Sequence, residues 1–125
     1  MNMNNIESKN NLKKFSNIDA CPIRNIIASF SGKWSILVLC LIAENPSIRF
    51  NTISKSIPDI SAKVLTDTLK SLERDGFVSK KIYAEIPPKV EYSLTDLGES
   101  LMPHIDGLIK WAIEHFQEVT GNRRG

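Results

Sequence analysis

The stretch ISAKVLTDTLKSLERDG, residues 60–76, carries the signals of one amphipathic helix. Ser61 is a good N-cap, because its hydroxyl can accept a hydrogen bond from an unpaired N–H of the first turn. Gly76 suits the left-handed position that commonly follows a helix. These signals predict a helix over residues 62–75.

This predicted helix has two different faces. Leucines recur at the spacing that places side chains on one side of a helix: Leu65, Leu69 and Leu72. The opposite side carries charged and hydroxyl side chains: Lys63, Thr66, Asp67, Lys70 and Arg74. We therefore expect the leucine face to pack on a core and the polar face to lie in solvent.

Four elements are predicted before this helix. Pro22 fits the first position of a helix that ends before Gly32, because its missing N–H would be unpaired there. Residues 33–44 are apolar almost all round, which predicts a helix buried on nearly every side. A short strand over residues 47–49 and a two-turn helix over residues 50–57 complete the series.

A β-hairpin and a last helix are predicted after it. Residues 77–85 and 89–94 read as two strands joined across two prolines, which predicts a hairpin with a stiff tip. Thr95 caps a final helical stretch whose apolar positions continue to Phe116. Pro103 is expected to kink or split that stretch.

This order of elements predicts an α+β fold, mainly α: a winged helix-turn-helix with a two-stranded wing. In that architecture the second helix of the turn enters the DNA major groove, and the hairpin reaches the flanking backbone or minor groove. Lysines and hydroxyls at those places can bind phosphates or base edges, so the candidate DNA contacts are Ser61, Lys63, Thr66, Lys70 and Lys89. The alternative is a merely solvated helix face and an ordinary turn lysine.

Length and composition favour one domain. The chain has 125 residues, of which 42% are hydrophobic, enough for a single core. We expect a flexible N-terminal arm over residues 1–17, the winged-helix DNA-binding and dimerisation domain over residues 18–120, and a tail over residues 121–125. Residues 49–89 hold eight basic and five acidic side chains, whereas residues 90–125 hold three basic and six acidic ones, so the two parts suit different partners.

Several classes of function are disfavoured. The longest apolar run, residues 36–43, is far shorter than the roughly twenty residues of a membrane span, so we expect a cytoplasmic protein with no membrane partner. The sequence lacks the spacing of a metal site, a phosphate loop or a catalytic triad. We therefore expect no catalytic residues, no metal, no cofactor and no enzymatic activity.

Short sequence blocks carry a resemblance to a known family over residues 20–116. The blocks are Cys21-Pro22-Ile23, Gly32-Lys33-Trp34, Arg49-Phe50, Ile60-Ser61-Ala62-Lys63-Val64-Leu65-Thr66, Leu72-Glu73-Arg74-Asp75-Gly76, and residues 85–95, EIPPKVEYSLT. In this order and spacing the sequence resembles the HxlR-type transcriptional regulators, which are close to the MarR-like winged-helix proteins. The resemblance implies a homodimeric bacterial DNA-binding regulator with N- and C-terminal dimerisation helices.

A homodimer also follows from the size of the recognition unit. About 45 residues offer few phosphate contacts, so we expect two copies on a pseudo-palindromic operator of double-stranded DNA. The candidate dimer contacts lie on the last helix: Leu101, Ile105, Leu108, Trp111 and Phe116. The alternative for these side chains is burial in the core of one chain.

Cys21 is a candidate redox or electrophile sensor. Its thiol is predicted at the N-terminus of a helix with Arg24 nearby, a setting that favours a reactive thiolate. Some HxlR-type proteins are thought to sense through a cysteine at this position. The alternative is a small buried residue, and Cys40, inside the apolar helix, is expected to be inert packing.

Three functions remain open: a DNA-binding regulator, repressor or activator; a winged-helix module that binds protein instead; and a thiol enzyme. The protein-binding module would lack a basic recognition face. The thiol enzyme would need a histidine or an acid beside one of the cysteines, and no such pattern is recognisable. The operator, the regulated genes and the effector are not specified by the sequence.

Overall fold

The computed structural model describes residues 19–125, so the arm predicted over residues 1–17 lies outside the described part of the chain. The elements, in chain order, are η1 (Ile23–Ile27), α2 (Ala28–Phe30), α3 (Lys33–Ala43), β1 (Ile48–Arg49), α4 (Phe50–Ser56), α5 (Ala62–Arg74), β2 (Val78–Tyr83), β3 (Lys89–Leu94), α6 (Asp96–Glu114) and α7 (Phe116–Arg124). The fold is mainly helical with a small antiparallel sheet, which confirms the predicted fold class.

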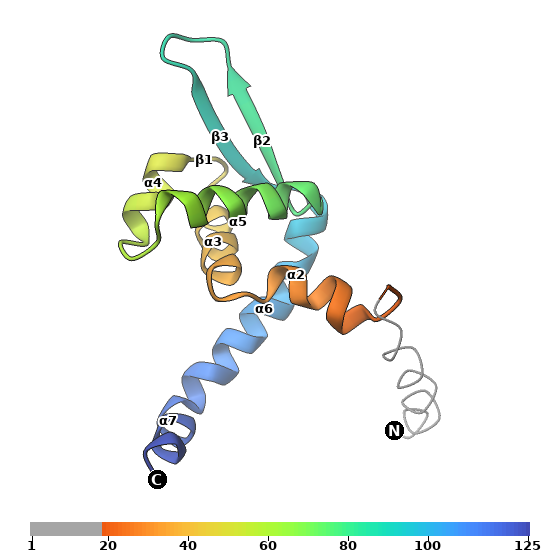
Figure 1. The fold of residues 1–125 in the computed structure, drawn as a ribbon, viewed down its shortest axis with the longest axis vertical. Coiled ribbons are helices and arrows are strands. Elements are labelled where there is room, and N and C mark those ends of the chain that lie inside the picture. The colour runs from red at the N-terminus through yellow and green to blue at the C-terminus, as the bar shows by residue number, and fades with distance from the viewer. Residues whose placement is uncertain (1–18) are drawn as a thin grey trace.

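The elements form a helical body from which two long structures project in different directions (Figure 1). The hairpin β2–β3 extends from one side of the body, and α5 crosses near the base of this hairpin. Helix α6 begins at the body and carries α7 away from it on the other side. The molecule therefore presents α5 and the hairpin at one end and the outer part of α6, residues 108–114, at the other.

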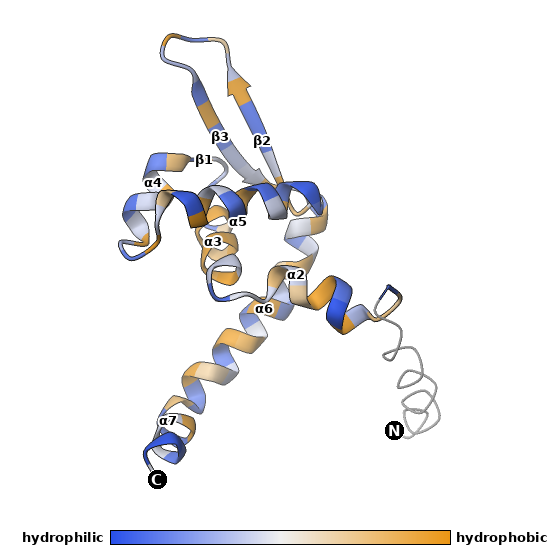
Figure 2. Ribbon diagram, viewed as in Figure 1, coloured by the Kyte–Doolittle hydropathy of each residue, from blue (hydrophilic) through white to orange (hydrophobic). Residues whose placement is uncertain are grey.

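The core is built around α3. Its side chains Val38, Leu39 and Ile42 are fully buried, and Figure 2 shows the helix as almost uniformly hydrophobic. The three leucines of α5 are buried in the same core, as their spacing predicts. Each such burial stabilises the fold by roughly 1.5–3 kcal/mol, so α3 and α5 hold the body together.

Helix α5 begins and ends where the sequence predicts, within one residue. The Ser61 hydroxyl oxygen accepts a hydrogen bond of 3.1 Å from the Val64 N–H. Gly76 has a φ of 85°, the left-handed conformation that an L side chain rarely adopts. The cap and the glycine therefore fix both ends of the helix.

The sheet has three strands in the order β1-β3-β2, all antiparallel. Strand β1 pairs with β3 at two positions, Ile48 with Tyr92 and Arg49 with Glu91. Strand β2 pairs with β3 from Val78 opposite Leu94 to the end of the hairpin. The short strand β1 thus attaches the start of α4 to the base of the hairpin.

The start of α6 is tied to the end of α5 through Thr95. Its hydroxyl donates a hydrogen bond of 2.6 Å to the Gly76 carbonyl and accepts one of 3.0 Å from the Gly98 N–H. Its backbone N–H donates to the Phe77 carbonyl at 3.1 Å. This confirms Thr95 as the N-cap and adds a connection to α5 that the sequence did not predict.

The last helix differs from the prediction in where it is interrupted and in where it ends. Helix α6 continues through Pro103 and the helix is interrupted at His115 instead. Pro103 is exposed, and a proline removes only one backbone hydrogen bond, which the remainder of this long helix tolerates. The predicted tail is helical as well, because α7 runs to Arg124.

The N-terminal helix takes a different form from the one predicted. Residues 23–27 form π-helical turns, and none of the side chains of η1 is buried.

Among the described residues, no single helix is long and apolar enough to cross a membrane. The segments Ile23–Phe30 and Lys33–Ala43 reach that length only together, and they are bent by 59°.

Candidate nucleic-acid interface

The solvent face of α5 carries exposed basic side chains. Lys63 lies in the first turn with its side chain 85% exposed, and its Nζ is 3.2 Å from Asp67 Oδ2. Exposed ion pairs of this kind contribute about 0.2–1 kcal/mol, so Lys63 can leave Asp67 for a stronger anion at little cost. Lys70 is also exposed, one turn beyond Asp67. The face therefore offers two cations that are not fixed by the fold.

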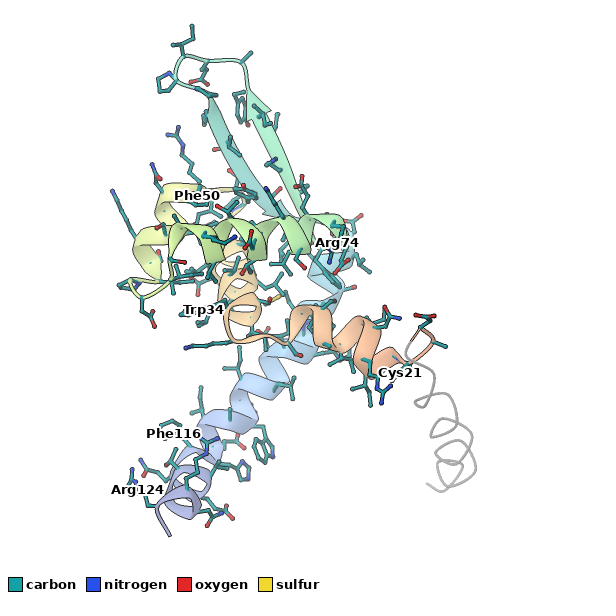
Figure 3. All side chains as sticks on the ribbon, in the orientation of Figure 1. Cys21, Trp34, Phe50, Arg74, Phe116 and Arg124 are labelled. Atoms are coloured by element: carbon teal, nitrogen blue, oxygen red, sulfur yellow. The ribbon has the colours of Figure 1, made fainter. Side chains whose placement is uncertain are left out.

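The hydroxyl residues of α5 are less free than the lysines. The oxygen of Ser61 is used as the cap acceptor, which leaves its O–H as a donor for a phosphate. Thr66 is half-buried. At the other end of the helix, Arg74 donates to the Ser71 hydroxyl at 3.3 Å and lies 3.4 Å from Asp75 (Figure 3). The N-terminal half of α5 is thus the more available half.

Lys89 is held within the hairpin. Its Nζ lies 3.7 Å from Glu91 Oε2 and 4.7 Å from the centre of the Tyr83 ring, and its side chain is 31% exposed. A hydrogen bond from the Tyr83 hydroxyl lowers the pKa of Glu91, and the charges of Lys89 and Arg49 lower it further. The structure therefore places Lys89 on the wing, as predicted, but with its charge already partnered.

Arg49 and Asn51 are candidate contacts that the sequence-based set lacks. Both are exposed, and together with Pro88 and Val90 they line a groove of about 210 Å³ beside the hairpin. Arg49 stands in one of the sequence blocks, but nothing in the sequence showed that β1 pairs with β3. The pairing brings a cation and an amide from the start of α4 next to the wing.

A second exposed surface is apolar and lies on the outer part of α6, on the other side of the helical body from the hairpin. Leu108, Trp111 and Phe116 are 61%, 54% and 60% exposed, and Figure 3 shows Phe116 far from the helical body. Three exposed isoleucines lie near the N-terminus of the described chain: Ile23, Ile26 and Ile27. Exposed apolar side chains in this number are typical of a surface that binds another protein.

One of the predicted dimer contacts belongs to the core, and another packs partly against it. Ile105 is 1% exposed and lies within the cluster built on α3, so its assignment to the dimer surface is wrong. Leu101 is half-buried and packs against the same cluster. Along α6 the two settings alternate, because Leu97 and Leu108 are exposed whereas Ile109 again packs against the cluster.

The two cysteines occupy different environments. Cys21 is 1% exposed, and its Sγ accepts a hydrogen bond of 3.4 Å from the Arg24 N–H, which places the sulfur at the start of the helix as predicted. Cys40 is half-buried and lines a groove between α3 and α6, so it is not enclosed packing. Burial raises the pKa of the Cys40 thiol, and the carboxylates of Asp106 and Glu44 raise it further.

Comparisons with known proteins agree with this architecture. A family model described as HxlR-like helix-turn-helix matches residues 29–120. An HTH-type transcriptional regulator of Halalkalibacterium halodurans is 39% identical over 102 residues, which are 82% of this chain and 90% of that protein.

Solved structures give the same picture. A MarR-family regulator from Porphyromonas gingivalis is 45% identical with a TM-score of 0.68, and the match covers 75% of this chain and 91% of that one. The redox regulator HypR in its reduced form is 31% identical with a TM-score of 0.75, covering 80% of this chain and 98% of HypR.

Proposed function

The chain belongs to the HxlR-like helix-turn-helix family of transcriptional regulators, and we propose that it binds double-stranded operator DNA as a homodimer. This family consists of regulators and not of enzymes, which disfavours the thiol enzyme. The observation that carries the proposal is the exposed free face of α5, on which Lys63 and Lys70 lie.

In the proposed complex, α5 lies in the major groove. Its N-terminus points unpaired N–H groups outward, and these favour a phosphate together with the Ser61 hydroxyl. Lys63 and Lys70 bind guanine edges or phosphates, and Thr66 contributes its hydroxyl at the rim. The hairpin and Arg49 contact the flanking backbone, whereas Lys89 mainly orders the strands around Tyr83 and Glu91.

The exposed apolar surface provides the dimer contact in this proposal. The outer part of α6, with Leu108 and Trp111, packs against its copy, and the isoleucines of η1 cover the remainder. A two-fold dimer of this kind presents two α5 helices about 34 Å apart, one turn of DNA. The operator is then pseudo-palindromic.

The test is an electrophoretic mobility shift with the DNA upstream of the protein's own gene, against a shuffled sequence of the same composition. We expect tighter binding to the upstream DNA and an affinity that falls steeply as salt rises, because phosphate contacts release counterions. A protein-binding module would show neither. Equal, salt-independent affinity for both DNAs would contradict the proposal.

Cys21 supplies a second, regulatory candidate. Its sulfur lies at the start of η1 beside the exposed isoleucines, so a modified thiol there would disturb the proposed dimer contact. The neighbour HypR is a redox regulator by its own description. DNA binding is titrated against diamide for the wild type and for Cys21→Ser. A response only in the wild type supports the sensor, and identical curves contradict it.

A further inference from the structure

A groove of about 620 Å³ lies between the C-terminal end of α3 and the inner half of α6. One wall is formed by Glu99, Met102, Asp106 and Ile109, which recur at the spacing of a single helix face. Leu94, the last residue of β3, closes the end nearest the hairpin. The volume is that of a site for one small organic molecule.

The lining divides into an apolar part and an acidic part. Leu94, Met102 and Ile109 are buried or half-buried and offer apolar surface. Glu44, Glu99 and Asp106 contribute three exposed carboxylates. No lysine, arginine or histidine of the described residues lines the groove.

The acidic part is not neutralised by the chain. Within residues 19–125, none of these three carboxylates forms an ion pair. On the α3 wall, burial raises the pKa of the Cys40 thiol, and the groove carboxylates of Asp106 and Glu44 raise it further. The carboxylates of the groove favour a positively charged ligand, and its apolar wall favours a ligand with an apolar part.

We propose that this groove binds a small organic cation with an apolar body. The cationic centre lies among Glu44, Glu99 and Asp106, and the apolar body packs on Leu94, Met102 and Ile109. A bare metal ion would leave the apolar wall exposed to water, and an organic anion would meet three carboxylates. The inference concerns binding alone and does not depend on the chain's binding to DNA.

The test uses two ions of nearly equal size and shape but opposite charge, tetraphenylphosphonium and tetraphenylborate. Each is titrated into the full chain by isothermal titration calorimetry at physiological salt. We expect saturable binding of the phosphonium at one site per chain and at least a tenfold weaker response to the borate. Equal binding of the two ions would overturn the proposal, as would no binding of the phosphonium.

Three variants locate the site. Glu44→Gln with Asp106→Asn removes two charges from the groove and is expected to weaken phosphonium binding at least tenfold. Glu114→Gln with Glu118→Gln removes two charges outside the groove and is expected to change binding less than twofold. Ala43→Phe keeps all charges but fills the groove, and it is expected to abolish binding.

Circular dichroism and the thermal midpoint establish that each variant is folded before the titrations are compared. A folded groove variant that binds the phosphonium as well as the wild type does would overturn the proposal, and so would an equal loss in the outer control pair.

Discussion

Helix α5 and the outer part of α6 are both amphipathic, but their free faces are opposites. The buried face of α5 is lined by leucines, and its free face carries Lys63, Asp67 and Lys70. On the outer part of α6, the apolar side chains of Leu108 and Trp111 lie in solvent. The difference teaches that one helix is complete within the chain whereas the other needs a further surface.

The chemistry of each free face indicates its partner. An exposed face with mobile lysines gains most from a polyanion, because phosphate contacts release counterions and tolerate water. An exposed apolar face gains most from another apolar face, because burial removes both from water. The chain thus separates recognition and assembly onto two helices, and changes in one helix can be used to test the other.

The largest effect is expected from a charge on the outer part of α6. Leu108→Asp or Trp111→Asp places a carboxylate in the proposed dimer contact and should leave monomers that each bind one half-site. Loss of bivalent binding weakens DNA affinity on the order of 10² to 10⁴-fold. Light scattering reports the mass and mobility shifts report the affinity. A wild type that is monomeric at micromolar concentration and still binds tightly would contradict this prediction.

The next effect concerns the start of α6, where Gly98 packs against the backbone of Phe77. A Cβ at Gly98 would meet the carbonyl oxygen of Phe77, which is backbone and cannot easily move. We expect Gly98→Ala to destabilise the fold by roughly 3 kcal/mol, the upper end of the usual overpacking cost. Denaturant unfolding measures it.

Gly107 provides the matched control on the same helix. No atom lies within 4 Å of a Cβ built there, so Gly107→Ala should stabilise α6 by about 0.5–1 kcal/mol. Equal effects of the two alanines on the free energy of unfolding would show that the close approach of Gly98 to the Phe77 carbonyl does not restrict this position.

A smaller effect is expected from removing one charge on α5. Lys63→Ala should weaken operator binding by about 1–3 kcal/mol if Lys63 binds a guanine, with thermal stability unchanged. Lys110→Ala removes an exposed lysine from α6 and should leave DNA affinity the same. Unchanged operator affinity in the folded Lys63 variant would argue against placing α5 in the groove.

The smallest effect is expected in the hairpin and depends on pH. The pKa of Glu91 is lowered in the folded chain, chiefly by a hydrogen bond from Tyr83, so its ionised form stabilises the fold at pH values above the ordinary pKa of a glutamate. This stabilisation is lost as the pH falls through the lowered pKa. Glu91→Gln should therefore decrease the thermal midpoint slightly at pH 7, and this decrease should shrink as the pH falls, whereas Glu85→Gln at the exposed tip should have no effect at either end of the range. A pH-independent difference would contradict the prediction.

Most of the body was predictable because its signals are local. The Ser61 cap, the leucine spacing and Gly76 act within a few residues of one another, and α5 forms as these signals indicate. The apolar run of α3 predicts the burial of this helix for the same reason, since a helix with no polar face has to lie inside the core.

The features that were predicted wrongly, or not at all, depend on distant residues. Ile105 and Leu108 stand on the same apolar pattern, yet Ile105 is buried in the core and Leu108 is exposed, and Ile109 beyond them packs against the core again. Lys89 has its partners on the other strand and two residues further along. Arg49 reaches the wing only through the pairing of β1 with β3. Periodicity and spacing carry no information on these contacts.

The hydrogen bonds of Thr95 have a consequence for the length of the operator. They link Gly76, which follows α5, to the first turn of α6, so they help to set the angle between these two helices within one chain. In a dimer assembled on α6, that angle and the crossing of the two α6 helices determine how many base pairs separate the half-sites. Exchanging residues on the free face of α5 would then change which bases are read, while the spacing between half-sites stays the same.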